Sequence, residues 1–288
     1  MESYTAPSGA RIHVSPDEQA GIRVLARGGP KDRERMLWSF LAAEFDYDTV
    51  LDLGANYGQV SLEFTYPEDV RIILVEANPG LLPFLERSIE THPNRGQIDL
   101  RGLALGDHEG TAKLFVRTDA VGKSSFVRER GDPIEVELGT VDALVPSSPR
   151  WSDAIIKVDV EGSELAVLEG AAKTLGGLEN YAIMVELHPD FMRRTAGSVG
   201  RFLEKLCAYG YLWERKTTGI IKPFDLYRFV RRDKLDDILI VSGDAYTARI
   251  RDFNRSLRKE PSTPAARASS RTHLRRWARR MTRVTGSR

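Results

Sequence analysis

Apolar runs of strand length alternate with helical patterns from Thr49 onward, and this alternation constrains the fold more than any other feature of the chain. The runs predicted as strands are Thr49–Leu53, Val70–Glu76, Ile98–Ala104, Ala112–Val116, Ile134–Leu138, Ala154–Val160, Tyr181–Leu187, Tyr211–Arg215, Leu226–Val230 and Asp237–Val241. The segments predicted as helices are Lys31–Glu44, Gln59–Phe64, Pro79–Thr91, Glu164–Leu175 and Val199–Tyr209. Such alternation predicts an α/β fold with a mostly parallel sheet covered on both faces. The late strands follow one another without helices, which predicts an antiparallel finish.

The 288 residues divide into three expected parts. These are an N-terminal extension (1–30) with weak strand signals at Arg11–Val14 and Ile22–Leu25, a domain (31–246) and a basic C-terminal tail (247–288). The single cysteine, Cys207, excludes an internal disulfide framework and suits a reducing compartment. The first residues lack a signal-peptide pattern, and no apolar run approaches the roughly 20 residues of a membrane helix. We therefore expect a soluble cytoplasmic protein.

The charge of the chain is unevenly distributed. Residues 249–288 carry 13 basic and 2 acidic side chains, a net charge of +11, whereas the preceding residues carry a net charge of −10. In the tail, apolar residues share one helical face with arginines around it: Leu274, Trp277, Ala278, Met281 and Val284. An amphipathic helix of this kind can lie on an anionic membrane or bind nucleic acid. Docking on the acidic body or on a partner subunit, and a disordered solvated tail, are the alternatives.

A glycine-rich turn, "LDLGANYGQ" (51–59), follows the first strand of the domain. A dinucleotide fingerprint that starts at Gly54 would need glycine at positions 56 and 59, which hold Asn56 and Gln59. No Gly-Lys-Ser/Thr follows, which excludes a P-loop. Asp52 before the turn suits the ammonium group of an amino acid, and Glu76 can accept hydrogen bonds from ribose hydroxyls. A ribose and an amino-acid ammonium without phosphate describe S-adenosylmethionine, whose adenine amino group Asp107 could reach.

The chain resembles the FkbM family of S-adenosylmethionine-dependent methyltransferases. The stretches that carry the resemblance are "DLGANYG" (52–58), "VEANP" (75–79), "ALGDHEG" (104–110), "GTVDAL" (139–144), "IKVDVEGSELAVLEGA" (156–171) and "VELHP" (185–189). The resemblance implies a Rossmann-like, seven-stranded class I methyltransferase sheet with an antiparallel last strand. It also implies O-methylation of a hydroxyl on a sugar, glycolipid or other secondary metabolite. The expected cofactor-binding residues are Asp52, Gly54, Ala55, Asn56, Tyr57, Gly58, Glu76, Ala77 (where the family commonly has proline), Asn78, Ala104, Leu105, Asp107 and Asp159.

Three carboxylates follow one strand closely in "VDVEGSE" (158–164). Lys157 and Asp159 share one strand face by alternation, and we expect Asp159 to face the cofactor. Glu161 in the turn would sit at the acceptor hydroxyl or hold a positioning contact, and Glu164 would stabilise the start of a helix. Methyl transfer to a hydroxyl benefits from a general base, for which "VELHP" offers His188 or Glu186. The catalytic candidates are therefore His188, Glu186, Asp159 and Glu161.

Several alternatives stay open at this point. Asp159, Glu161, Glu186 and His188 could ligate a metal, but their spacing does not require one and we assign none. Lys123-Ser124-Ser125 could line an acceptor pocket or form a plain surface loop. A nucleic-acid methyltransferase is disfavoured by the acidic body and by the lack of an Asn-Pro-Pro-Tyr-type motif. A non-catalytic binding module is disfavoured by the retained strand-end acids. The expected partner is a small-molecule or glycan acceptor, and the oligomeric state is undetermined.

Overall fold

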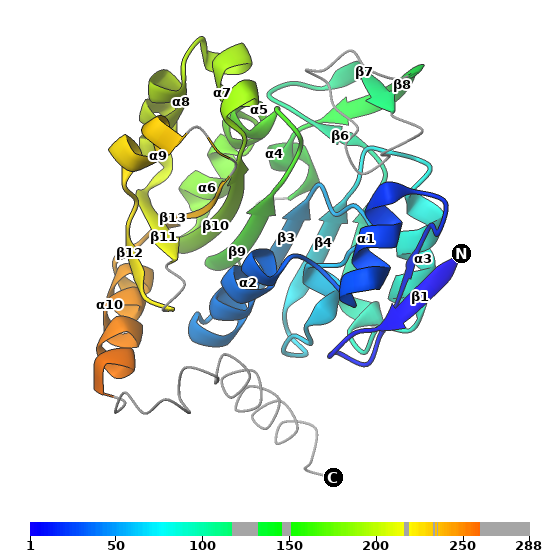
Figure 1. Ribbon diagram of the computed structural model, residues 1–288, viewed down its shortest axis with the longest axis horizontal. Coiled ribbons are helices and arrows are strands. Elements are labelled where there is room, and N and C mark those ends of the chain that lie inside the picture. Colours follow the sequence, from blue (N-terminus) through cyan, green and yellow to red (C-terminus); the bar gives the residue numbers. More distant parts are fainter. Residues whose placement is uncertain (117–131, 146–150, 216–218, 233, 235, 260–288) are drawn as a thin grey trace.

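A mixed eight-stranded sheet with helices on both faces forms the centre of the computed structural model, which describes residues 1–116, 132–145, 151–215, 219–232, 234 and 236–259 (Figure 1). The strand order is β12 (Ile221–Pro223), β11 (Tyr211–Arg215), β13 (Asp236–Ser242), β10 (Asn180–Leu187), β9 (Asp153–Val158), β3 (Thr49–Leu53), β4 (Arg71–Val75) and β5 (Ile98–Arg101). The five strands from β10 to β5 are parallel, and β13 is antiparallel to both of its neighbours. The antiparallel last strand is confirmed, but the sheet has eight strands rather than seven because β12 extends its edge.

Ten α-helices lie within the described residues. They are α1 (Gln19–Arg27), α2 (Asp32–Glu44), α3 (Leu82–Glu90), α4 (Val141–Leu144), α5 (Glu164–Glu169), α6 (Ala172–Gly177), α7 (Pro189–Ala196), α8 (Val199–Leu206), α9 (Leu226–Arg232) and α10 (Asp244–Lys259). The predicted helix 164–175 is broken between α5 and α6 at Gly170, and the predicted helix 59–64 is only the 3₁₀ turn Ser61–Glu63. No helix in these ranges is long and apolar enough to cross a membrane.

Two short segments predicted as strands are helical. Residues 226–230 lie in α9, where the Asp225 carboxylate accepts a hydrogen bond from the Arg228 backbone N–H at 2.9 Å and so begins the helix. Residues 22–25 lie in α1, which ends at Gly28 with a left-handed φ of 65°. A four- or five-residue apolar run fits one helical face as well as a strand, so periodicity alone could not decide these two segments.

A separate three-stranded sheet contains two of the predicted strands. Its order is β6 (Ala104–Leu105), β8 (Asp132–Gly139) and β7 (Gly110–Val116), so the predicted strand 98–104 is divided between β5 and β6. The loop with Lys123-Ser124-Ser125 and the predicted tail helix around Trp277 lie outside the described residues.

The N-terminal segment belongs to the apolar core of the domain. In the hairpin of β1 (Glu2–Thr5) and β2 (Arg11–Val14), the side chains of Ile12 and Val14 are fully buried in the cluster that contains α2 and α3 residues. The backbone N–H of His13 donates to the Ser88 hydroxyl on α3 at 2.9 Å. At the other end, α10 runs continuously through residue 246, the predicted border of the tail. The domain borders drawn from the sequence remain a prediction.

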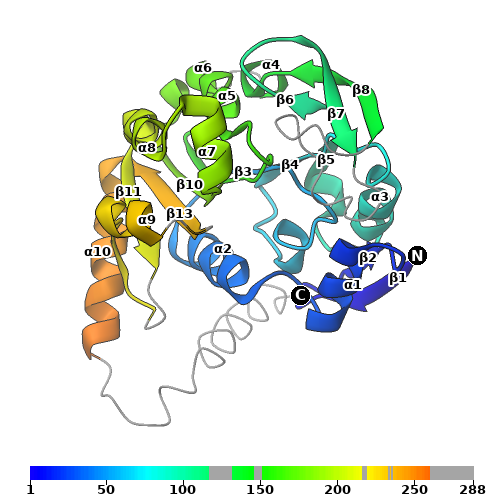
Figure 2. The ribbon, with the colours of Figure 1, turned by 45° about the horizontal axis from the view of Figure 1, so that its top comes forward.

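The carboxyl ends of the parallel strands meet at one edge of the sheet, which is tilted toward the viewer in Figure 2. Because β13 is antiparallel, its first residues lie at this same edge beside the end of β10. The helices α1, α2, α5 and α7 surround these strand ends in that view (Figure 2). Ligands of open α/β sheets bind at this edge, which makes these strand ends the candidate site.

Candidate active site

The glycine-rich turn after β3 requires its glycines. Gly54 has a φ of 85°, and a Cβ atom at this position would lie 2.0 Å from the Asp159 carbonyl oxygen. Asn56 also adopts a left-handed φ, of 54°, and Gly58 has a φ of 72°. The backbone N–H groups of Gly54 and Ala55 both donate to the Val75 carbonyl, at 3.0 and 2.9 Å. The turn is therefore held against the ends of both β4 and β9.

Glu76 connects this turn to the end of β4. Its Oε2 accepts from the Asn56 N–H at 2.7 Å, and its Oε1 accepts from the Asn78 N–H at 2.8 Å. Burial raises the pKa of Glu76, while these two hydrogen bonds oppose the rise. Each oxygen keeps further acceptor capacity, and the contact of Glu76 with ribose hydroxyls stays a prediction.

A buried lysine lies beneath the turn. The Lys157 Nζ donates to the Gly54 carbonyl at 2.8 Å and lies 3.2 Å from the Asp52 Oδ1 and 3.4 Å from the Asp159 Oδ2. Burial alone would lower the pKa of Lys157, but the two carboxylates outweigh it and raise the pKa. The predicted shared face of Lys157 and Asp159 is thus confirmed. Asp52 is fully buried and also accepts from the Ser61 hydroxyl at 2.6 Å, so its contact with a cofactor ammonium stays a prediction.

The remaining predicted cofactor residues lie around the same edge, with different exposure. Tyr57 is fully buried and its hydroxyl donates to Glu18 at 2.9 Å, next to α1. Ala104 and Leu105 are buried in β6, and Ala77 is half-buried. Asp107 is exposed, with its Oδ1 2.7 Å from the Nδ1 of His108, which lowers the pKa of Asp107.

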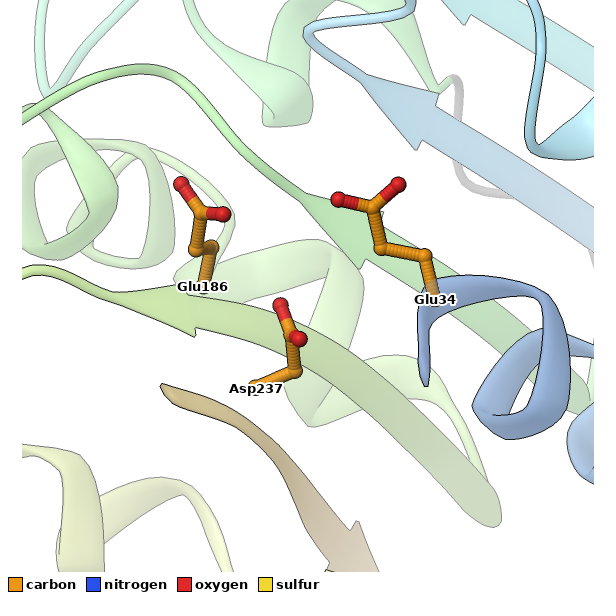
Figure 3. Close-up of side chains that lie close together, drawn as sticks. All are labelled: Glu34, Glu186 and Asp237. Atoms are coloured by element: carbon orange, nitrogen blue, oxygen red, sulfur yellow. The ribbon is translucent and has the colours of Figure 1, made fainter. Parts of the chain in front are cut away.

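Carboxylates gather around Asp159 and Glu186. One oxygen each from Asp159, Glu161 and Glu186 lie within 4.8 Å of one another, and the same holds for Glu34, Glu186 and Asp237 (Figure 3). Glu186 belongs to both groups, and it lies opposite Asp237 in the pairing of β10 with β13. Glu161 has a left-handed φ of 50°, as befits its predicted place in the turn after β9. The three predicted acids Asp159, Glu161 and Glu186 are therefore brought together.

Strand alternation explains why these groups share one face of the sheet. In each strand, the residue two positions away belongs to the apolar cluster beneath α2: Val50 for Asp52, Ile155 for Lys157, Met184 for Glu186 and Leu239 for Asp237. On this face of the sheet, the apolar residues are therefore followed at the strand ends by the charged side chains of Asp52, Lys157, Glu186 and Asp237.

Two cations from the start of α2 face the carboxylates. The Lys31 Nζ lies 2.7 Å from the Glu34 Oε1 and 2.9 Å from the Glu186 Oε1. The Arg33 guanidinium forms ion pairs with Asp236 and, at 3.5 Å, with Asp237. These groups counter part of the negative charge at the site.

Burial changes the proton affinity of the acids. It raises the pKa of Glu186 to about 8, with Asp159 adding to the rise and Lys31 opposing it. It raises the pKa of Asp237 to about 6, where Glu34 adds and Arg33 opposes. It raises the pKa of Glu164 to about 7, although the Gly162 N–H donates to that carboxylate at 2.9 Å. Glu164 begins α5 as predicted, but it is buried and lies in the field of Asp159 and Glu186.

His188 is placed differently from the other candidates. It immediately precedes α7, and its ring lies 4.7 Å from the Phe191 ring, centroid to centroid. It is not a member of either carboxylate group found among the described residues. Of the two predicted base candidates, Glu186 therefore belongs to the carboxylate groups of the described residues, and His188 stays a prediction.

Sequence reasoning missed Lys31, Glu34 and Asp237. Lys31 and Glu34 stand at the start of a predicted helix, and an acid three residues after the N-terminal cap is a usual signal for a helix start. Asp237 begins a strand that was predicted, and only its antiparallel placement beside β10 reveals the contact with Glu186. Nothing local in the sequence indicates that these residues meet the "VELHP" segment.

An open α/β sheet with an antiparallel last strand, a glycine turn that lacks phosphate-binding signals and an acid directly after β4 are the features expected of a methyltransferase that uses S-adenosylmethionine. A family model, the methyltransferase FkbM domain, matches residues 52–212. The chain belongs to the FkbM methyltransferase family. No curated protein matches it in sequence.

Solved structures with similar folds are remote in sequence. The methyltransferase FkbM of Methylobacillus flagellatus KT is 16% identical with a TM-score of 0.42, covering 76% of this chain and 57% of its own. A putative O-methyltransferase of Klebsiella pneumoniae is 13% identical (TM-score 0.43, 76% of this chain and 87% of its own). The O-methyltransferase TomG of Streptomyces achromogenes, solved with S-adenosylmethionine, is 11% identical (TM-score 0.43, 74% and 80%). The chain thus spans little more than half of the Methylobacillus protein.

The residues of the turn fit the cofactor. Two carboxylates, Glu76 and Asp159, directly follow the strands on either side of the Gly54 turn, and such hydrogen-bond acceptors suit ribose hydroxyls and a positively charged sulfonium rather than a pyrophosphate. S-adenosylmethionine supplies an electrophilic methyl group, and the protein must supply its alignment with the acceptor.

Proposed function

We propose that this methyltransferase methylates a hydroxyl group of a sugar, glycolipid or other secondary metabolite, with Glu186 as the general base. The observation that carries the proposal is the position of Glu186. It is the last residue but one of β10, and one of its carboxylate oxygens lies within 4.8 Å of an oxygen of Asp159 and of Glu161, on the same sheet edge as the glycine turn. A hydroxyl bound there would lie between a carboxylate that can take its proton and the turn expected to hold the methyl donor.

Methyl transfer to a hydroxyl gives Glu186, Glu161 and Asp159 a separate role each. The Glu186 carboxylate takes the proton of the acceptor hydroxyl as its oxygen forms a bond to carbon, and the carbon–sulfur bond electrons leave with sulfur. Glu161 accepts a hydrogen bond from the acceptor and fixes its orientation. Asp159, paired with Lys157 at 3.4 Å, provides a negative charge on the cofactor side. A base is most effective when its pKa lies near the working pH, and Glu186, with a pKa of about 8, meets that condition.

The test measures transfer of labelled methyl groups to sugars, glycolipids, small hydroxylated metabolites and RNA. We expect a hydroxylated small molecule or glycan to be labelled and the rate to fall as the pH drops below about 8, because Glu186 then takes up a proton. Glu186→Gln should lower kcat by about 10²- to 10⁴-fold and abolish that pH dependence. Glu169→Gln, an exposed acid on α5, serves as the matched control.

Two results would replace the proposal. Labelling of RNA without labelling of any hydroxylated small molecule or glycan would make the chain a nucleic-acid methyltransferase. A larger loss of activity for His188→Ala than for Glu186→Gln, with the acidic limb of the rate profile unchanged in the latter, would transfer the role of base to His188.

A further inference from the structure

The start of α2 reaches the proposed base from outside the matched family domain. Residues 31–34 precede the matched segment 52–212, and Asp237 follows it. Yet Lys31 lies 2.9 Å from Glu186, and Glu34 and Asp237 form a compact carboxylate group with it (Figure 3). The family match therefore covers Glu186, Asp159 and Glu161 but not Lys31, Glu34 and Asp237.

We propose that Lys31 is a positioning residue for the reaction, which favours the ionised form of the Glu186 carboxylate in the midst of the surrounding carboxylates. This inference rests on the proposed role of Glu186 as base. The N-terminal end of α2 would then contribute to catalysis, in addition to the glycine turn and the "VELHP" segment.

The charges around Glu186 require such a cation. Negative groups face it from every neighbouring element: Glu34 on α2, Asp159 and Glu161 after β9, Glu164 on α5 and Asp237 on β13. Each of these disfavours a further negative charge. The Lys157 ammonium is bound to Gly54, Asp52 and Asp159, and Arg33 is paired with Asp236 and Asp237. Lys31 is the cation that lies against Glu186 itself, at hydrogen-bonding distance.

The geometry also fixes where Lys31 can act. Its Nζ bridges the Oε1 of Glu34, at 2.7 Å, and the Oε1 of Glu186. Its backbone N–H donates to the Glu34 Oε2 at 3.3 Å, and Lys31 occupies the N-terminal cap of α2. Glu34 thus holds Lys31 at both its backbone and its side chain, and competes with Glu186 for the ammonium. Removal of Glu34 should therefore act on Glu186 in the opposite direction to removal of Lys31.

The closing experiment measures the titration of Glu186 directly, without requiring an acceptor. Carboxyl carbons of ¹³C-labelled glutamate are followed by NMR as a function of pH, with Glu186 assigned through Glu186→Gln. We expect Lys31→Met to raise the titration midpoint by about one unit, which is a tenfold loss of the ionised form below the midpoint. Lys31→Arg should restore it, and Glu34→Gln should lower it. Lys173→Met, an exposed lysine on α6, should leave it unchanged.

Lys31→Met and Glu34→Gln each remove one partner of the Lys31–Glu34 ion pair. Shifts of the Glu186 titration midpoint in opposite directions cannot arise from a general loosening of the fold. An unchanged Glu186 midpoint in a folded Lys31→Met protein, or equal shifts in Lys31→Met and Lys31→Arg, would overturn the proposal. The pH dependence of methyl transfer is recorded for the same variants. If the NMR midpoint moves while the acidic limb of the rate does not, Glu186 is not the base, and the proposed mechanism fails although Lys31 still sets the charge of Glu186.

Discussion

At the scale of single residues, Lys157 is the charge on which the turn depends. Its side chain is only 3% exposed, and its ammonium group contacts a carbonyl and two carboxylates. A buried ion pair is weak evidence for a net gain in stability, but removing one partner leaves the other charge buried without compensation. Asp52 is fully buried directly opposite Lys157 in the strand pairing, so it is the group that would be left in this state.

We expect Lys157→Met to lower the free energy of unfolding by about 3–5 kcal/mol, measured by urea denaturation at neutral pH. Lys173→Met, at an exposed position, should change it by less than about 0.5 kcal/mol. Adding Asp52→Asn to Lys157→Met should recover part of the loss, because the uncompensated charge is then absent. A double variant no more stable than Lys157→Met alone would contradict this electrostatic explanation.

At the scale of elements, the turns after β3 and β9 are packed directly on one another. The Asp159 N–H donates to the Leu53 carbonyl at 3.0 Å, and the Asp159 carbonyl lies against Gly54. Both turns contain a residue other than glycine with a left-handed φ, Asn56 and Glu161. Backbone conformations of this kind persist where surrounding contacts fix them. Here the contacts between the two turns fix the conformation of each.

Gly54→Ala should therefore separate the two turns. Its Cβ would lie 2.0 Å from a backbone oxygen that no side-chain rotation can move. We expect affinity for S-adenosylhomocysteine, measured by calorimetry, to fall at least about tenfold, or about 1.4 kcal/mol. Gly96→Ala, where a Cβ would meet nothing within 4 Å, is the matched control. Affinities for the two variants that agree within twofold would show that the turn can relax.

The elements were predictable to different degrees for physical reasons. The buried strands β3, β4, β9 and β10 stand out as apolar runs between turns, and the "VDVEG" turn follows from its glycine and acids. The segment 226–230 is short, and its apolar residues fit either period, so only the Asp225 cap indicates a helix. Glu186 was predicted from its place at a strand end. Its partners Lys31 and Asp237 were not, because 155 and 51 positions separate them from it in the printed sequence and only sheet topology brings them together.

At the scale of the whole molecule, charge is divided between an acidic body and a basic tail. Carboxylates lie at the strand ends of the described part of the chain. Residues 260–288, outside that part, contain eight arginines and one glutamate. Basic residues close to an anionic membrane contribute about 1 kcal/mol each. We propose that this segment brings the protein to anionic lipid surfaces, where a glycolipid acceptor would also reside.

The chain should cosediment with vesicles that contain phosphatidylserine, more strongly at low than at physiological salt because screening weakens the attraction. A variant that ends at residue 259 should stay in the supernatant while still binding S-adenosylhomocysteine. Vesicles of neutral lipid are the control for apolar insertion. A full-length chain that fails to bind anionic vesicles at either salt concentration would remove the proposed membrane role.

The single ammonium group of Lys157 joins two parts of the site, since it bonds to the Gly54 carbonyl in the turn after β3 and lies 3.4 Å from Asp159, which is grouped with Glu161 and Glu186. We expect that a ligand that draws on one of these contacts alters the other. Thermodynamic reciprocity then requires that the factor by which the cofactor changes acceptor affinity equals the factor by which the acceptor changes cofactor affinity. The order in which the two molecules arrive is consequently a matter of rates alone, because their joint affinity is the same by either route.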